Sequence, residues 1–146
     1  MKMRLNALLF VIFAGCQLAG AAQTMNILVK NIKPNPNGVI RIAFFADEIG
    51  FKTERQLFDI TFEKEKVKNG ELEVIIPVKA GRYGIAVMDD VNNSAKMEYK
   101  LLVIPQKGFG FSNFKLKALQ KPRFDDFAFD IEKDEVKNVV VYMKYM

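Results

Sequence analysis

The chain contains no histidine, no tryptophan and a single cysteine, Cys16, which lies close to the N-terminus. From residue 23 onward there is neither cysteine nor histidine. That absence excludes thiol nucleophiles, imidazole bases, disulfides and Cys/His zinc sites from this part of the chain. Such a domain must be held together by its apolar core. We therefore expect a protein that is not an enzyme and has no cofactor.

The excess of positive over negative charge is also small. The formal net charge is +5, from 22 Lys and Arg against 17 Asp and Glu. No basic stripe interleaved with aromatic residues marks a nucleic-acid surface, so no nucleic-acid partner is expected. The lysines Lys64, Lys66 and Lys68 are predicted to form one solvated strand edge that discourages edge-to-edge pairing.

The first residues have the order of a secretory signal peptide. Lys2 and Arg4 precede an apolar run over residues 5–14, and small residues follow at 19–22. We expect residues 1–22 to be a signal peptide and residues 23–146 to be one domain, exported to the periplasm or the extracellular space. An alternative is a lipid anchor at Cys16, because residues 13–16 resemble a bacterial lipoprotein box. No transmembrane segment is expected in the mature chain.

Apolar and polar residues alternate with period two along most of the domain, which is typical of strands with one buried face. Together with the absence of a long amphipathic helix, this predicts an all-β fold. We expect an antiparallel two-sheet sandwich of about seven strands, immunoglobulin-like or transthyretin-like. The predicted strands are 26–32, 39–46, 58–63, 71–76, 83–87, 126–132 and 139–145. Short helical turns are expected within 48–57 and 115–119.

Register and turns follow from the same pattern. The strand at 39–46 is apolar on both faces and is predicted to be central. Asn69-Gly70 predicts a hairpin between the strands at 58–63 and 71–76, because both residues tolerate positive φ. The residues predicted to be buried are Phe62, Val74, Ile85, Phe129 and Val141.

Residues 81–113 interrupt this alternation and carry a resemblance to a known family. Their sequence is GRYGIAVMDDVNNSAKMEYKLLVIPQKGFGFSN. The segment resembles the domain-of-unknown-function 2141 family of exported bacterial proteins, without gaps. The matching residues are Gly81, Tyr83, Asp90, Asn92, Pro105, Gly108, Gly110, Phe111 and Ser112, followed later by Pro122, Phe124 and Phe127.

Departures from the family pattern fall mostly on polar positions. They are Asp89 for His, Ser94 for Asn, Glu98 for Asp, Lys100 for Asn, Val103 for Gly and Lys107 for Glu. Any site that the family forms with its full pattern therefore lacks several of its usual residues in this chain. The resemblance implies export and a sandwich fold, and it leaves the function open.

An oxygen-rich stretch follows the strand at 83–87. Asp90, Asn92, Ser94 and Glu98 have a loose version of the spacing in calcium loops. The same residues also suit a polar turn whose side chains bond their own backbone. The stretch lacks the central glycine of a tight calcium loop, so no metal site is favoured.

The Gly-aromatic stretch at residues 108–113 is a second candidate. Glycines allow the backbone to approach either a ligand or its own sheet. Phe109 and Phe111 could present a stacking surface or could plug the core. The candidate ligand-binding residues are Asp89, Asp90, Asn92, Phe109, Phe111, Ser112 and Asn113.

Two classes of function remain open. The first is an exported non-catalytic domain, expected to be monomeric, that binds an envelope protein or small ligand through loops at one end. The second is a carboxylate-based hydrolase of envelope or extracellular carbohydrate, with Asp125 and Asp126 opposite Asp89 and Asp90.

Export yields the first testable prediction. Expressed in a bacterium with its own N-terminus, the protein is expected to lose its first 21 or 22 residues, because cleavage is predicted after Ala21 or Ala22. Intact-mass measurement of the purified protein checks this. An uncut chain would contradict export, and a lipidated chain beginning at Cys16 would contradict ordinary cleavage.

Overall fold

A computed structural model describes residues 23–117 and 120–146. The predicted signal peptide, with Cys16, lies outside the described residues. So do the last two residues of the helical turn predicted at 115–119, and residues 115–117 are not helical.

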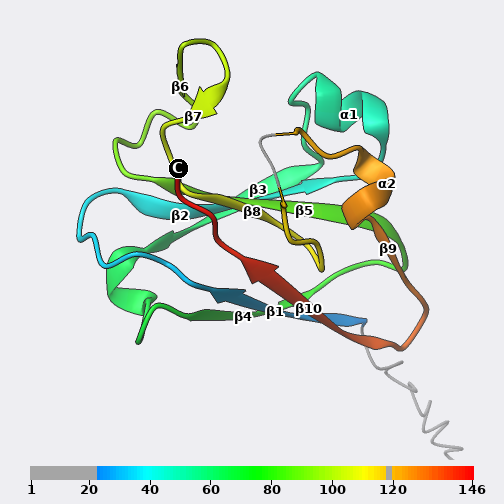
Figure 1. Cartoon of the computed structure of the whole chain (residues 1–146). Coiled ribbons are helices and arrows are strands. Elements are labelled where there is room, and N and C mark those ends of the chain that lie inside the picture. The colour runs from blue at the N-terminus through cyan, green and yellow to red at the C-terminus, as the bar shows by residue number, and fades with distance from the viewer. Residues whose placement is uncertain (1–22, 118–119) are drawn as a thin grey trace, which may run out of the picture.

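Two sheets pack face to face, so the predicted all-β sandwich is confirmed (Figure 1). One sheet has the strand order β10-β1-β4 and the other has the order β3-β2-β5-β8. The first sheet consists of β1 (Thr24–Lys30), β4 (Leu72–Pro77) and β10 (Val136–Tyr142). The second consists of β2 (Val39–Phe45), β3 (Phe58–Glu63), β5 (Gly81–Asp90) and β8 (Phe109–Phe111), and β9 (Phe129–Ile131) pairs with the start of β5.

Short elements cover the outer face of the second sheet. Figure 1 shows α1, α2 and the β6–β7 hairpin on the side of this sheet that faces away from β1, β4 and β10. Their bounds are α1 (Glu48–Lys52), α2 (Phe124–Phe127), β6 (Tyr99–Lys100) and β7 (Ile104–Pro105). A 3₁₀ turn, η1 (Lys64–Lys66), follows β3.

The strand predictions hold for most of the chain, and β2 is central as expected, between β3 and β5. The described residues form ten strands, not about seven, because the short strands β6, β7 and β8 were not predicted. Two further details are wrong. β1 and β10 pair in parallel, not antiparallel, with Thr24 opposite Val136. The two strands come from opposite ends of the domain, so no tight hairpin dictates their relative direction.

The second wrong detail is the strand predicted at 126–132. Phe124–Phe127 form the helical turn α2, and only Phe129–Ile131 are extended. Asp126 accepts a hydrogen bond from the backbone N–H of Arg123 at 2.8 Å, which closes this turn. Phe127 and Phe129 are both buried, as the alternation implied, but in different layers of the molecule.

The core between the sheets is built from the inward residues of both. Of the five residues predicted to be buried, Val74, Ile85, Phe129 and Val141 are buried in it. Phe62 is only partly buried against the core. It lies on β3, one of the two edge strands of its sheet, where less of the side chain is covered.

A second, aromatic cluster holds α1 and α2 on the outer face. Phe51 of α1 and Phe127 of α2 meet edge to face, with ring centroids 4.9 Å apart. Glu48 accepts a hydrogen bond from the N–H of Phe124 at 2.5 Å, which ties the two helical turns together. Gly84 makes room for the rings, since a Cβ there would lie 2.6 Å from atoms of Phe124 and Phe127.

The tight turn at Asn69-Gly70 is present, but the predicted hairpin is wrong, because β3 pairs with β2 and β4 pairs with β1 in the other sheet. Lys68 and Glu71 exchange two backbone hydrogen bonds of 2.8 and 2.9 Å. Asn69 and Gly70 have φ of 52° and 75°, as the two central residues of a type I′ turn require. The turn stands where the chain passes from the second sheet to the first.

The position of Ile85 at the centre of the core predicts a large effect of truncation. Ile85→Ala is expected to lower the free energy of unfolding by about 2–5 kcal/mol, because it leaves a cavity between the sheets. Urea denaturation measures the change. Ile75→Ala is the matched control, because Ile75 is 73% exposed on β4. Equal effects of the two substitutions would show that the assigned strand register is wrong.

Candidate functional site

Two carboxylates end the strand β5. Asp89 and Asp90 are adjacent, so their side chains point to opposite faces of the sheet. Both are fully buried, with 1% and 0% of their surface exposed. Burial of an ionised carboxylate is very costly unless it is paired and hydrogen-bonded. The partners of these two residues therefore determine how this end of the sandwich is organised.

Asp89 faces the space between the sheets. Its carboxylate forms an ion pair with the ammonium of Lys64. It also accepts a hydrogen bond of 2.8 Å from the hydroxyl of Tyr145, which in turn accepts one of 3.0 Å from the N–H of Lys33. Burial and the contact with Asp89 raise the pKa of Tyr145, so its hydroxyl keeps the proton that it donates.

Lys64 therefore does not lie on the solvated edge that the sequence predicted, and that prediction is wrong for this residue. The turn η1 starts at Lys64, directly after β3 ends, so the strand alternation no longer applies to it. The side chain is buried and reaches Asp89.

Asp90 faces outward and is held by a different set of donors. The ammonium of Lys107 lies 2.7 Å from Oδ1, and the N–H of Ala95 donates to Oδ2 at 2.9 Å. The guanidinium of Arg41 lies 3.4 Å from Oδ2 and also pairs with Asp59 at 2.6 Å. Burial alone would raise the pKa of Asp90. The hydrogen bonds from Lys107 and Ala95 and the charges of Lys107 and Arg41 outweigh it and lower that pKa.

The ammonium of Lys107 is surrounded by oxygen atoms of the loop after β5. Asp90 Oδ1, Ser94 Oγ and the carbonyl oxygen of Lys96 each lie 2.7 Å from Nζ. Glu98 Oε1 lies 3.6 Å away. An ammonium has three hydrogens to donate, and the three nearest oxygens match them.

Three of the four residues considered for calcium thus surround a positive charge that the chain itself supplies. The fourth, Asn92, donates a hydrogen bond of 2.7 Å to Glu98. This bond and that from Ser94, together with the nearby Lys107, lower the pKa of Glu98. Over residues 23–117 and 120–146, no group of three or more His, Cys, Asp or Glu is arranged to hold a metal ion.

The Gly-aromatic stretch uses its special residues for packing within the chain. A Cβ on Gly108 would lie 2.2 Å from the ring of Tyr145, and one on Gly110 would lie 2.6 Å from the carbonyl oxygen of Tyr142. Ser112 is fully buried, where its hydroxyl donates to Phe127 O at 2.7 Å and accepts from Ile85 N at 2.9 Å. Asn113 Oδ1 accepts from Val140 N at 3.0 Å.

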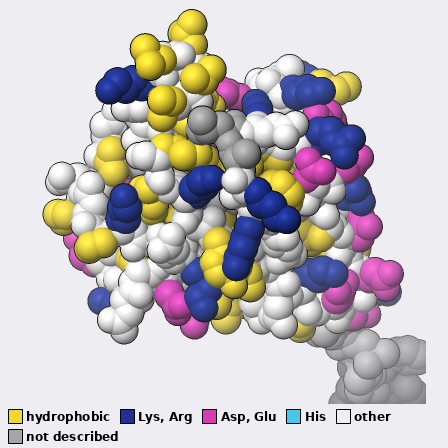
Figure 2. Space-filling view, viewed as in Figure 1, with side chains coloured by type: hydrophobic (Ala, Val, Ile, Leu, Met, Phe, Trp, Pro, Cys, Tyr) yellow, Lys and Arg dark blue, Asp and Glu magenta, His cyan; other side chains and the backbone are white. Residues whose placement is uncertain are grey.

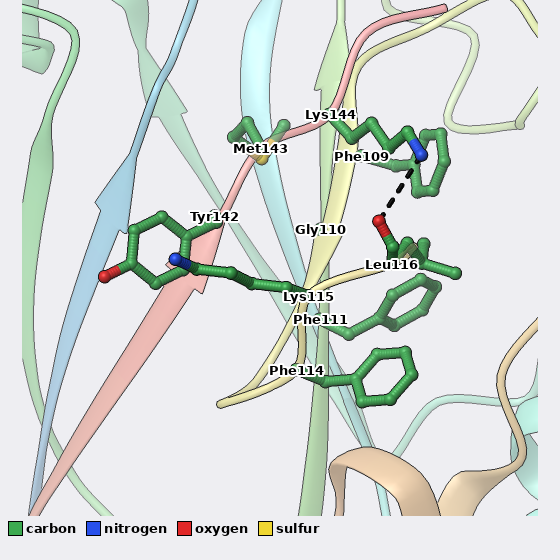
Figure 3. A pocket seen from close by; sticks show the side chains of 9 residues that line it. All are labelled: Phe109, Gly110, Phe111, Phe114, Lys115, Leu116, Tyr142, Met143 and Lys144. Atoms are coloured by element: carbon green, nitrogen blue, oxygen red, sulfur yellow. Dashed lines mark hydrogen bonds between the residues drawn. The ribbon is translucent and has the colours of Figure 1, made fainter. Parts of the chain in front are cut away.

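Phe109 and Phe111 border a shallow pocket of about 250 Å³ (Figure 3). It lies between β8, β10 and residues 114–116. The ammonium of Lys115 lies 3.9 Å from the ring centroid of Tyr142, and that of Lys144 donates to Leu116 O at 3.4 Å. The volume is below the range of about 300–1,000 Å³ typical of small-molecule sites. The pocket could hold only a small group.

The structure does not bring the two aspartate pairs together. Asp125 forms a 3.1 Å ion pair with Arg82, at the beginning of β5, whereas Asp89 and Asp90 end the same strand. The seven residue steps from Arg82 to Asp89 span about 23 Å of strand. Glycoside hydrolysis needs carboxyl groups about 5–9.5 Å apart. The acid–base pairing considered from the sequence is therefore wrong.

Sequence reasoning missed Lys64, Lys107 and Tyr145. Two adjacent aspartates at the end of an otherwise apolar strand were a signal, because buried carboxylates require cationic partners. The sequence offers many lysines, however, and does not show which of them the fold brings to this strand end.

Sequence reasoning also missed an exposed apolar tip. The β6–β7 hairpin carries Tyr99, Leu101, Leu102 and Val103, which are 50%, 77%, 92% and 61% exposed. Figure 1 shows the hairpin projecting from the body of the molecule, and Figure 2 shows hydrophobic side chains gathered at the same place. We call residues 99–103 the hairpin tip.

These features define an all-β sandwich domain whose loop end is organised by internal ion pairs. Residues 27–139 match the family described as an uncharacterized protein conserved in bacteria (DUF2141), and the chain belongs to this family. No curated protein and no solved structure matches the chain significantly. None of the helices formed by the described residues is long and apolar enough to cross a membrane.

The lowered pKa of Asp90 predicts how acid affects stability. Its ionised form stabilises the fold above the unfolded-state pKa, about 3.9, and this contribution is lost as pH falls through the folded-state pKa. Asp90→Asn is expected to be less stable than the wild type at neutral pH. It is also expected to lose less stability between about pH 4 and pH 2. Urea denaturation at a series of pH values measures both.

The effect of calcium on stability is a separate prediction. Because the ammonium of Lys107 already lies among the loop oxygens, about 1 mM calcium is expected to leave the melting temperature of the wild type unchanged. A rise in the wild type that disappears in Asp90→Asn would show that a metal ion displaces this ammonium.

Proposed function

We propose that the chain is an exported, non-catalytic domain of the bacterial envelope that binds its partner through the hairpin tip. The observation that carries this proposal is the exposure of contiguous apolar residues there, above all Leu101 and Leu102. Of the other exposed apolar residues, Ile49, Ile75 and Val136 lie on separate elements, and the adjacent pair Leu57 and Phe58 is less exposed, at 56% and 39%. Single exposed apolar residues are normal, whereas contiguous ones mark interaction sites.

The hairpin has a firm base, as a binding element requires. The N–H of Gln106 donates to the carbonyl oxygen of Glu98 at 2.8 Å, which joins the two ends of the hairpin. Directly beyond it, Lys107 is fixed among the loop oxygens, and the carbonyl oxygen of Gly108 accepts from the N–H of Asp89 at 2.8 Å. The hairpin tip therefore projects from a base that these hydrogen bonds hold in place.

The state of the carboxylates supports a role other than catalysis. A general acid or base must be within reach of a substrate. Asp89 and Asp90 are buried and paired with lysines of this chain, and Asp125 lies at the opposite end of β5. Export rests on the basic, apolar and small residues of the N-terminus.

Co-sedimentation with bacterial envelope fractions tests the proposal. The wild type is expected to bind. Leu101→Asp/Leu102→Asp is expected to bind at least about tenfold less, because burying aspartate in an apolar contact is unfavourable. Both leucines are exposed, so the fold is expected to persist with stability changed by about 0.5 kcal/mol or less per site.

Ile75→Asp is the matched control. It places the same charge at a residue that is 73% exposed on β4, away from the hairpin, and it is expected to bind like the wild type. If the double variant stayed on the envelope fraction as well as this control, the hairpin tip would not be the contact element.

A further inference from the structure

The turn of the β6–β7 hairpin has residues that its backbone does not favour. The N–H of Val103 donates to the carbonyl oxygen of Lys100 at 3.3 Å, and the central residues Leu101 and Leu102 have φ of 52° and 65°. Positive φ at both central residues is type I′ geometry, which strongly prefers Asn and Gly. Another turn of this kind among the described residues uses that preferred pair, Asn69-Gly70.

In the part of the chain that the structure describes, the two leucines bury little surface that could offset this unfavourable backbone. Left-handed backbone conformations are costly for residues other than Gly, Asn and Asp, and they are enriched at functional sites. Leu101 and Leu102 are among the most exposed apolar residues of the described chain, at 77% and 92%. Their apolar surface is therefore available for a contact outside this molecule.

The shape of the hairpin tip limits what it can contact. A stable protein–protein interface uses about 20–30 residues on each side. The tip consists of the five residues 99–103 and projects from the body of the molecule (Figure 1). A few projecting apolar side chains with an aromatic residue at their base suit insertion into the boundary region of a lipid bilayer, where tyrosine is enriched.

The charges beside the tip are complementary to anionic lipid. Lys96 and Lys100 are exposed, and Glu98 is the one acidic residue between positions 91 and 107. Glu54, from the segment after α1, also lies near Tyr99, and burial together with the charge of Glu54 raises the pKa of that tyrosine. Glu98 is already engaged by Asn92, Ser94 and Lys107. Figure 2 shows a basic side chain next to the apolar group at this place. Lysines near a bilayer surface are attracted to anionic headgroups.

We propose that the hairpin tip docks on an anionic lipid surface. Leu101 and Leu102 enter the boundary between headgroups and acyl chains, Tyr99 lies at the level of the headgroups, and Lys96 and Lys100 contact anionic headgroups. This inference rests on the proposed function, in that the tip is the contact element, and it specifies the partner.

Vesicle co-sedimentation tests the inference with the purified protein, expressed as the full chain. The wild type is expected to bind vesicles of phosphatidylethanolamine and phosphatidylglycerol, more weakly at high salt, and to bind phosphatidylcholine vesicles much less. Lys100→Gln is expected to weaken binding about fivefold, the effect of one lysine near an anionic surface.

The decisive variant is Leu101→Asn/Leu102→Gly. It gives the turn the residues that its backbone prefers, so its melting temperature is expected to equal or exceed that of the wild type. Its binding to the anionic vesicles is expected to fall at least tenfold. Ile75→Asn is the matched control and is expected to bind like the wild type. A variant that folds at least as well but no longer binds separates the contact from stability.

Three outcomes would overturn the inference. Undiminished vesicle binding by Leu101→Asn/Leu102→Gly would show that the tip is not the lipid contact. Equal binding to neutral and anionic vesicles would refute the selectivity for anionic lipid. Binding to envelope fractions through the leucines, without binding to any vesicle, would show that the tip docks on a protein. In that last case the proposed function stands and the lipid inference fails.

Discussion

The loop end of this molecule depends on the neutralisation of two adjacent buried carboxylates. Asp89 and Asp90 point to opposite faces of β5, and each is met by a buried ammonium from a distant part of the chain, Lys64 on one face and Lys107 on the other. A buried pair of this kind gains little net stability, but the loss of one partner leaves an unpaired charge. The 3₁₀ turn, Tyr145 near the C-terminus and the loop after β5 are thereby fixed to the end of one strand.

Period-two alternation predicted the strands well because each has one face in a common core. It identified β2, β3, β4 and β5 closely and four of five chosen core residues. It could not identify the partner of each strand, and so missed the parallel pairing of β1 with β10. Alternation also cannot tell whether an apolar residue faces the sandwich or a layer outside it, which is why Phe127 of α2 was assigned to a strand.

The candidate site was predictable in part. The spacing of Asp90, Ser94 and Glu98 resembled a calcium loop only loosely and a metal site was not favoured, whereas the structure places these oxygens around a positive charge. Local spacing could not reveal that the cation is the side chain of Lys107. Lys107 lies beyond the loop in the sequence and contacts Asp90 only in the folded chain. The family pattern has Glu at this position, so Lys107 reverses the charge there. The hairpin tip escaped prediction because a run such as 101–104 looks like core when only hydrophobicity is read.

The position of Lys107 has a consequence for how the loop responds to its surroundings. A bound ion occupies its ligands only as far as its concentration exceeds a dissociation constant. An ammonium on the same chain is present at an effective concentration set by geometry alone. Neither dilution nor a chelator can remove this ammonium. Competing ions in the medium do not change its effective concentration. The conformation of this loop is therefore fixed by the sequence itself. The hairpin beyond the loop keeps the same base in any ionic environment that leaves the fold intact.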